Sequence, residues 1–168
     1  MSYHIETDIN SDGVNHPSVS IYFHGCDKPV KCKGCHNYQL WEFDDIVINE
    51  KKLYKQIKTQ INKIKKFYPK VAVCFLGGEP LSPQYRSFVY YLSHMFSNDS
   101  KVLTILYSWR TLEDINNNEE LVKVTGEVDY GVLGAFDENY LVDDFPASSN
   151  QIIYDFKHNK KITKEEII

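Results

Sequence analysis

The sequence predicts an α/β fold, a partial and open β/α barrel built on a mostly parallel sheet. Apolar runs typical of buried strands alternate with segments whose apolar residues recur at helical spacing. The chain has 168 residues, fewer than the roughly 250 of a closed eight-fold barrel, so we expect the barrel to stay open. We predict one domain over 1–168, with a core at about 3–154 and a C-terminal tail at 155–168.

Four runs of apolar and β-branched residues predict the strands, at 19–23, 71–76, 102–107 and 128–133. The second run is apolar throughout, which is typical of a strand covered on both faces. A cysteine-rich loop follows the first run and a Gly-Gly-Glu-Pro turn follows the second. The carboxyl ends of parallel strands meet at one edge of a sheet, where ligands bind, so we expect these two loops to lie together.

Capping signals and apolar stripes predict three helices. Asn49 is a candidate N-cap for a helix at 50–68, whose lysine-rich faces are those of an ordinary amphipathic helix. Ser82, followed by a proline, resembles an N-cap with a first-turn proline. Thr111 and Asp114 have the spacing of a capping box at the start of a third, short helix.

The composition excludes several classes of protein. Lys and Arg total 19 and Asp and Glu total 23, so the net charge is −4 and no global basic field for nucleic acid exists. No apolar run approaches the roughly 20 residues of a membrane-spanning helix, and the polar N-terminal stretch is unlike a signal peptide. Four cysteines are too few for a disulfide scaffold, which favours a reducing, cytoplasmic location.

Three of those cysteines, Cys26, Cys32 and Cys35, form a C-x5-C-x2-C motif. Thiolate is a soft ligand that suits both iron–sulfur clusters and zinc. The spacing alone leaves open a 4Fe–4S cluster, a zinc ion completed by a neighbouring histidine, or no metal at all. Three thiolates would leave a four-iron cluster one ligand short and open to substrate. Cys74 lies within a predicted strand and is expected to be a small buried apolar residue.

The second motif is Gly77-Gly78-Glu79-Pro80. Paired glycines after a strand let the backbone approach a ligand closely, and Glu79 adds a carboxylate able to accept from an ammonium group. Taken alone, the same residues describe an ordinary turn between a strand and a helix.

Together, the cysteine loop and the Gly-Gly-Glu-Pro turn resemble those of the radical S-adenosylmethionine enzymes. The resemblance extends to Cys35-His36-Asn37-Tyr38-Gln39-Leu40-Trp41 and to Ser148-Ser149-Asn150-Gln151. Within that superfamily the chain is similar to the activating components of anaerobic (class III) ribonucleotide reductases, over about 3–154. It departs from their usual pattern in the five-residue gap between its first two cysteines, in Ser108-Trp109 and in Ala147.

The resemblance implies a radical-SAM type of barrel and an oxidoreductase. Cys26, Cys32 and Cys35 would ligate one 4Fe–4S cluster, and S-adenosyl-L-methionine would chelate the fourth iron. Reductive cleavage would give methionine and a 5′-deoxyadenosyl radical, which takes a hydrogen atom from a glycine of the large subunit of the anaerobic ribonucleoside-triphosphate reductase. No catalytic residue beyond the cluster and cosubstrate is implied. The implied partners are that reductase and an electron donor such as flavodoxin or ferredoxin, with neither nucleic acid nor membrane.

The resemblance also implies contacts with the cosubstrate. Gly77 and Gly78 would lie along its methionine part, with Glu79 near the amino group and Ser108 near the carboxylate. The adenosine side would be lined by Gly34 and His36. Two alternatives stay open: a radical S-adenosylmethionine enzyme acting on a small molecule, similar to the carboxydeazaguanine synthases, and a zinc-stabilised binding module without catalysis.

Overall fold

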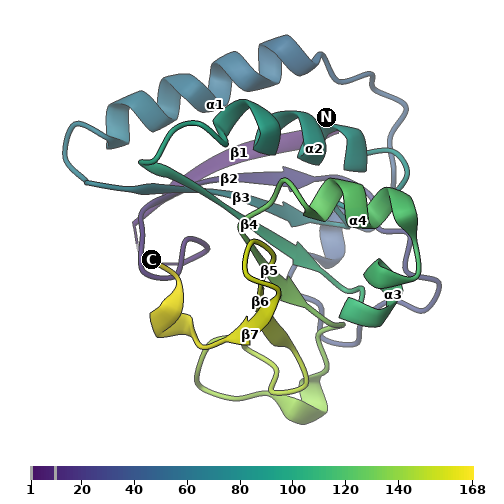
Figure 1. Cartoon of the computed structure of the whole chain (residues 1–168). Helices are drawn as coiled ribbons and strands as arrows, with labels where there is room; N and C mark the ends of the chain where they lie inside the picture. The colour runs from purple at the N-terminus through teal and green to yellow at the C-terminus, as the bar shows by residue number, and fades with distance from the viewer. Residues whose placement is uncertain (1, 10) are drawn as a thin grey trace.

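The computed structural model describes residues 2–9 and 11–168. In this part of the chain seven strands form one sheet in sequence order. They are β1 (Tyr3–Asp8), β2 (Ser18–Phe23), β3 (Val71–Gly77), β4 (Val102–Ser108), β5 (Tyr130–Leu133), β6 (Ile152–Asp155) and β7 (Lys160–Ile162). The helices are α1 (Glu50–Ile64), α2 (Arg86–Phe96), α3 (Leu112–Asn116) and α4 (Glu119–Thr125). Helices α1, α2 and α4 lie over one face of the sheet (Figure 1).

The sheet is mixed. Strands β2 to β5 run parallel, whereas β1 pairs antiparallel with β2, β6 with β5 and β7 with β6. The predicted α/β class and open sheet are confirmed, but the expectation of a mostly parallel sheet was wrong, because half of these six pairings are antiparallel. The sequence did not predict β1, β6 or β7. Strands β1 and β7 are polar strands at the two edges of the sheet, and β6, between β5 and β7, has only four residues.

Two of the three predicted helix starts are confirmed. The Asn49 side chain accepts from the N–H of Lys52 at the start of α1, which ends at Ile64 rather than at 68. The capping box of Thr111 and Asp114 is present at the start of α3. The predicted cap at Ser82 was wrong, because a separate turn comes first and α2 begins at Arg86.

The two faces of the sheet bury separate apolar clusters. Between sheet and helices the core includes Leu53, Ile57, Phe75, Leu92 and Leu106, all fully buried. On the opposite face Ala72, Cys74, Leu76, Ile105 and Val132 form a second cluster, so Cys74 is the buried apolar residue that was predicted.

Residues 155–168, predicted as a tail, are packed against the rest of the chain. The C-terminal segment curls toward the face of the sheet that lacks helices (Figure 1). There Asn15 Nδ2 donates to the carbonyl of Lys164 over 2.7 Å, and His16 Nε2 lies 3.3 Å from that of Ile167. Asn15 and His16, which precede β2, therefore contact the last residues of the chain. One of these, Ile167, is buried in the second apolar cluster.

Candidate functional site

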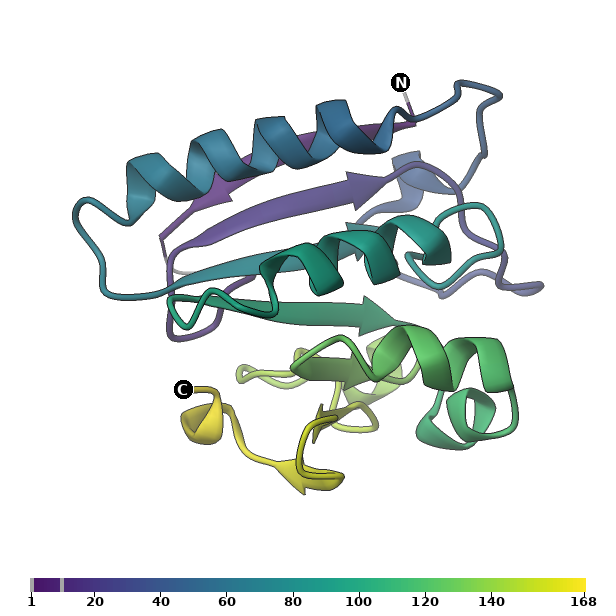
Figure 2. The same cartoon turned by 45° about the horizontal axis from the view of Figure 1, so that its top comes forward.

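The cysteine loop and the Gly-Gly-Glu-Pro turn lie side by side, as the strand order predicted. In Figure 2 the arrowheads of β2 and β4 point to the same edge of the sheet. Phe23, the last residue of β2, is in register with Gly77, the last residue of β3. Beyond the strands, the carbonyl of Phe23 accepts from the N–H of Gly78, and that of Gly25 from Glu79, both over 2.8 Å. The main chain thus fixes the two loops to each other.

The paired glycines permit this contact. Gly77 has a φ of +105°, a conformation that side chains disfavour. A Cβ atom on Gly78 would lie 1.9 Å from the carbonyl oxygen of Gly25. Gly78 therefore packs backbone to backbone against the residue that precedes Cys26. The paired glycines were predicted to let the backbone approach a ligand. In the structure, Gly78 instead lets the backbone approach the cysteine loop.

All three cysteines of the motif are half-buried. A turn joins two of them, since the N–H of Cys35 donates to the carbonyl of Cys32 over 3.3 Å. Burial raises the pKa of the Cys26 and Cys32 thiols, and Lys28 opposes this through its N–H at Cys26 and its charge at Cys32. A metal that binds these sulfurs must therefore displace protons. Among the described residues no three His, Cys, Asp or Glu side chains are placed to hold a single metal ion.

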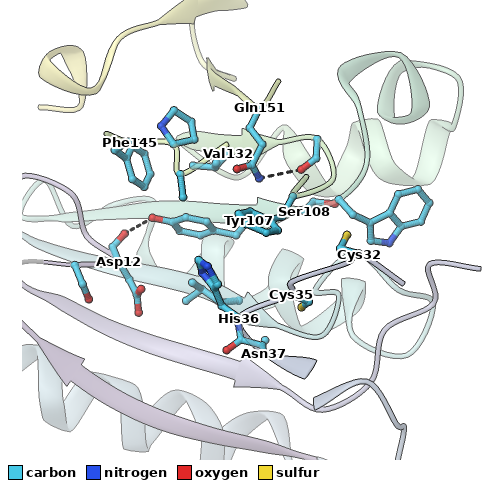
Figure 3. Close-up of a pocket in the computed structure, with 18 of the residues that line it drawn as sticks. Asp12, Cys32, Cys35, His36, Asn37, Tyr107, Ser108, Val132, Phe145 and Gln151 are labelled. Carbon is cyan, nitrogen blue, oxygen red and sulfur yellow. Dashed lines mark hydrogen bonds between the residues drawn. The ribbon is translucent and has the colours of Figure 1, made fainter. Parts of the chain in front are cut away.

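A cavity of about 710 Å³ opens beside the cysteine loop on the helix-free face of the sheet. Cys32, Cys35 and Ser108 lie at one end of it, the cysteine end (Figure 3), and Gly77 and Gly78 also line it. Asp12 lies at the other end of the view in Figure 3, with the Tyr107 ring between. The Tyr107 hydroxyl donates to the carbonyl oxygen of Asp12 over 2.5 Å, and the Tyr22 hydroxyl donates to the carboxylate of Asp12 over 2.7 Å.

Four of the six residues predicted to contact a cosubstrate line this cavity: His36, Gly77, Gly78 and Ser108. The His36 ring faces that of Phe136, with 4.9 Å between their centroids. Gly34 and Glu79 do not line it. Gly34 lies instead against Glu138, whose carboxylate pairs with Lys33 over 2.7 Å.

Glu79 points into the protein and is fully buried, so its placement does not fit the predicted contact with an ammonium group. Its carboxylate accepts from the hydroxyl of Ser108 over 2.8 Å and from the N–H groups of Leu81 and Trp109 over 2.9 and 3.1 Å. Burial raises the pKa of Glu79 to about 7, against the opposing charge of Arg110 and these hydrogen bonds. Glu79 thus joins the loops that follow β3 and β4.

Arg110, which was not predicted from the sequence, extends this network to the cysteine loop. Its Nη1 lies 3.1 Å from Glu79 Oε1 without the alignment of a hydrogen bond, and its Nη2 donates to Asp27 Oδ2 over 2.5 Å. The Trp109 indole donates to Asp27 Oδ1 over 3.1 Å, and the guanidinium stacks 4.6 Å from the ring. Asp27 directly follows Cys26, so a buried cation holds the cysteine loop against two other loops.

Comparison with known proteins identifies the kind of site. Residues 9–154 match the family described as a 4Fe-4S single cluster domain. The chain belongs to this family. No curated protein and no solved structure matches the chain.

The donor set of this 4Fe–4S domain fits the group. Cysteine thiolates are the usual ligands of such a cluster, and three occur on one loop beside an open cavity. Each thiolate of a four-iron cluster binds a different iron, so the sulfurs need not converge on one point as ligands of a single zinc ion must. Family membership favours iron–sulfur among the alternatives that the cysteines alone left open. The assignment of Cys26, Cys32 and Cys35 as ligands stays a prediction.

The Ser-Ser-Asn-Gln stretch holds another loop of the 4Fe–4S domain in place. Ser148 is fully buried and its hydroxyl donates to the carbonyl of Asp137 over 3.0 Å. Asn150 Nδ2 donates to the carbonyl of Ala135 and Gln151 Nε2 to that of Gly134, over 2.8 and 2.9 Å. These contacts fix the loop at 134–137. Phe136 belongs to this loop, so they also hold its ring against that of His36.

None of the helices in the described residues is long and apolar enough to cross a membrane.

Proposed function

We propose that this 4Fe–4S domain is a radical S-adenosylmethionine activase that generates a glycyl radical on an anaerobic ribonucleoside-triphosphate reductase. The observation that carries the proposal is that Cys32, Cys35, Gly77 and Gly78 line the same cavity. A cosubstrate in that cavity would reach the cluster and the exposed main chain of the turn at once. The volume, about 710 Å³, lies within the range of small-molecule sites.

A 4Fe–4S cluster supplies a low-potential electron for cleavage of the sulfonium carbon–sulfur bond. The chain's own residues bind and orient the cosubstrate. Gly77 and Gly78 offer main-chain groups to its methionine part, and Ser108 offers a hydroxyl near its carboxylate. The rings of His36 and Phe136 form an apolar flank suited to the adenine. Glu79 acts as a positioning residue, because it holds Ser108 and the N–H of Trp109 from inside the protein.

One observation favours a second candidate, a radical S-adenosylmethionine enzyme that acts on a small molecule. The Asp12 end of the cavity is polar, because the side chains of Asp12 and Asn15 line it beside the Tyr107 hydroxyl, and a separate polar substrate would fit there. Both candidates use the cysteine end in the same way. They differ in whether the abstracted hydrogen comes from a protein glycine or from a ligand beside Asp12. A cytoplasmic setting, where thiols stay reduced, belongs to either proposal.

The test is an anaerobic incubation of the reconstituted protein with dithionite and S-adenosylmethionine, with and without a class III reductase. We expect release of 5′-deoxyadenosine in both cases and a glycyl radical signal by electron paramagnetic resonance only with the reductase. Cys32→Ala should abolish both. Release of 5′-deoxyadenosine without any glycyl radical would favour the small-molecule candidate, and no release from cluster-loaded protein would refute both.

A further inference from the structure

A surface outside the cavity has no role in the proposed chemistry. An apolar groove of about 470 Å³ runs between β1 and the start of α1. We call it the β1–α1 groove; its lining includes Tyr3, Ile5, Ile46, Val47, Ile48 and Lys52. Val47 is 92% exposed and Ile46 57%, an unusual state for two consecutive β-branched residues. Paired exposed apolar residues beside a groove are typical of an interaction surface.

The chemistry of a partner follows from the charges beside this groove. Eight lysines and no carboxylate lie between 51 and 70, while the whole chain has a net charge of −4. Lys51, Lys52 and Lys55 are exposed on the first turns of α1, next to the groove. Among the described residues none of these three makes an ion pair with a carboxylate. Glu50 is the single acidic residue of α1. An acidic partner with an apolar centre complements this surface.

The groove lies close to the cysteine loop. Its wall includes His4, whose Nδ1 is 3.1 Å from Nε2 of His24, two residues before Cys26. The N–H of His24 also donates to the carbonyl of Ser2, another residue of the groove, over 2.9 Å. In Figure 2 the start of α1 and the cysteine loop lie at the same end of the molecule. A protein docked at the groove would therefore sit near the cluster on the side away from the cavity.

We infer that the β1–α1 groove and Lys51, Lys52 and Lys55 form the docking surface for an acidic one-electron carrier protein that reduces the cluster. The inference rests on the proposed function, which requires an electron. One electron leaves the carrier's cofactor and enters the cluster, whose charge falls from 2+ to 1+. No covalent bond changes in either protein. Docking on this side leaves the cavity free for the cosubstrate.

The test measures binding directly. Reduced flavodoxin, an acidic carrier, is titrated against the cluster-loaded protein, and Kd is determined at low and high salt. We expect Lys51→Glu/Lys55→Glu to raise Kd about tenfold at low salt and to flatten its salt dependence. The matched control is Lys63→Glu/Lys66→Glu, which makes the same charge change on exposed residues at and just beyond the far end of α1 and should leave Kd within about twofold of the wild-type value. Equal effects of the two variants would overturn the inference.

A second arm separates docking from catalysis. With dithionite, which needs no docking surface, the Lys51→Glu/Lys55→Glu protein should release 5′-deoxyadenosine and form glycyl radical at wild-type rates. Loss of the glycyl radical alone would assign the surface to the reductase and overturn the inference. If wild-type protein releases no 5′-deoxyadenosine with dithionite, the proposed function fails, while the binding result still stands.

The groove and the alternative occupants are tested by the same titration. Val47→Ser removes the two exposed methyl groups of Val47, so less apolar surface is buried on binding and Kd should rise several-fold. An unchanged Kd would show that the groove is not part of the docking surface. Binding of fluorescent single-stranded DNA that is lost in Lys51→Glu/Lys55→Glu, with flavodoxin binding unchanged, would assign the lysines to nucleic acid. A dimer in solution that this variant dissociates would assign them to a second copy. Either result would overturn the inference.

Discussion

Arg110 and Asp27 form an ion pair, with 2.5 Å between Nη2 and Oδ2, that joins the loop after β4 to the residue after Cys26. The same guanidinium faces the buried carboxylate of Glu79 in the Gly-Gly-Glu-Pro turn. The two acidic residues come from loops that follow different strands, and one cation lies between them. The shape of the cysteine loop therefore depends on a residue more than 70 positions away in the sequence.

Arg110→Met should destabilise the protein in a manner that depends on pH. The substitution leaves Glu79 buried without its cation, which costs about 3 kcal/mol of unfolding free energy where the carboxylate is ionised. At pH 5.5 Glu79 takes up a proton and the loss should be smaller. Anaerobic urea unfolding at pH 5.5 and 8 measures the difference. Addition of Glu79→Gln to Arg110→Met should restore part of the stability at pH 8; no recovery would contradict this account.

Glu79 also makes the wild-type stability depend on pH. Burial raises its pKa from 4.5 to about 7, so the folded state binds more protons than the unfolded state between these values. The stabilising contribution is complete below pH 4.5 and is lost as the pH rises through 7, a change of about 3 kcal/mol. Urea unfolding from pH 5 to 8 should show this fall in wild-type protein and a flatter profile in Glu79→Gln. Parallel profiles would show that Glu79 has an ordinary pKa.

Replacement of any one motif cysteine should remove the cluster. After anaerobic reconstitution, Cys26→Ala, Cys32→Ala and Cys35→Ala should retain little iron or sulfide, because a two-thiolate site holds a four-iron cluster weakly. The control is Cys74→Ala, which removes a buried sulfur from β3 and should keep the full cluster at a cost of about 1 kcal/mol in stability. Iron and sulfide analysis decides the result. Full iron content in any motif variant would exclude that cysteine as a ligand.

Gly78→Ala should disturb the cysteine loop. The new Cβ would lie 1.9 Å from the Gly25 carbonyl oxygen, so the two loops must separate and cluster incorporation should fall several-fold. Gly126→Ala is the matched control, because Gly126 has helical φ at the end of α4 and its Cβ would meet no atom closer than 3.3 Å. Iron content and the visible absorption of the reconstituted proteins measure the effect. Similar cluster content in the two variants would contradict the proposed contact.

Ser148→Ala should loosen the loop at 134–137. The substitution leaves the N–H and carbonyl of Asp137 without the hydroxyl, at a cost of about 1–3 kcal/mol. Hydrogen exchange of the amides at 134–137 should accelerate at least tenfold. The neighbouring Ser149→Ala changes an exposed serine and should leave that exchange unaltered. Unchanged protection in Ser148→Ala would show that Asn150 and Gln151 hold the loop by themselves.

The sequence predicted the parts of the fold whose patterns are local and strong. The apolar runs of β2, β3 and β4 and the capping box at Thr111 needed no tertiary information. Strand β7 could not be found, because its Lys-Lys-Ile sequence adopts an extended form only through its pairing with β6. Helix α4 has a clear cap in Asn118, and the sequence analysis overlooked it.

The sequence predicted which loops form the candidate site, but the predicted role of Glu79 was wrong. The motif cysteines and Gly77 and Gly78 lie together, because the ends of neighbouring parallel strands must meet. The orientation of Glu79 could not be predicted, since it depends on a cation from another loop. The hydrogen bond from the Trp109 indole to Asp27 could not be predicted either. Nothing in the local pattern distinguishes such an indole from an ordinary core residue.

The contact between Gly78 and Gly25 constrains how this protein can change over time. A collision there involves main-chain atoms, which every amino acid carries, so no compensating side-chain replacement at position 25 can relieve it. A suppressor screen starting from a bulkier residue at 78 should therefore recover true revertants to glycine, or insertions that lengthen a loop. The two positions are expected to stay fixed in descendants of this chain, whatever ligand the neighbouring cavity binds.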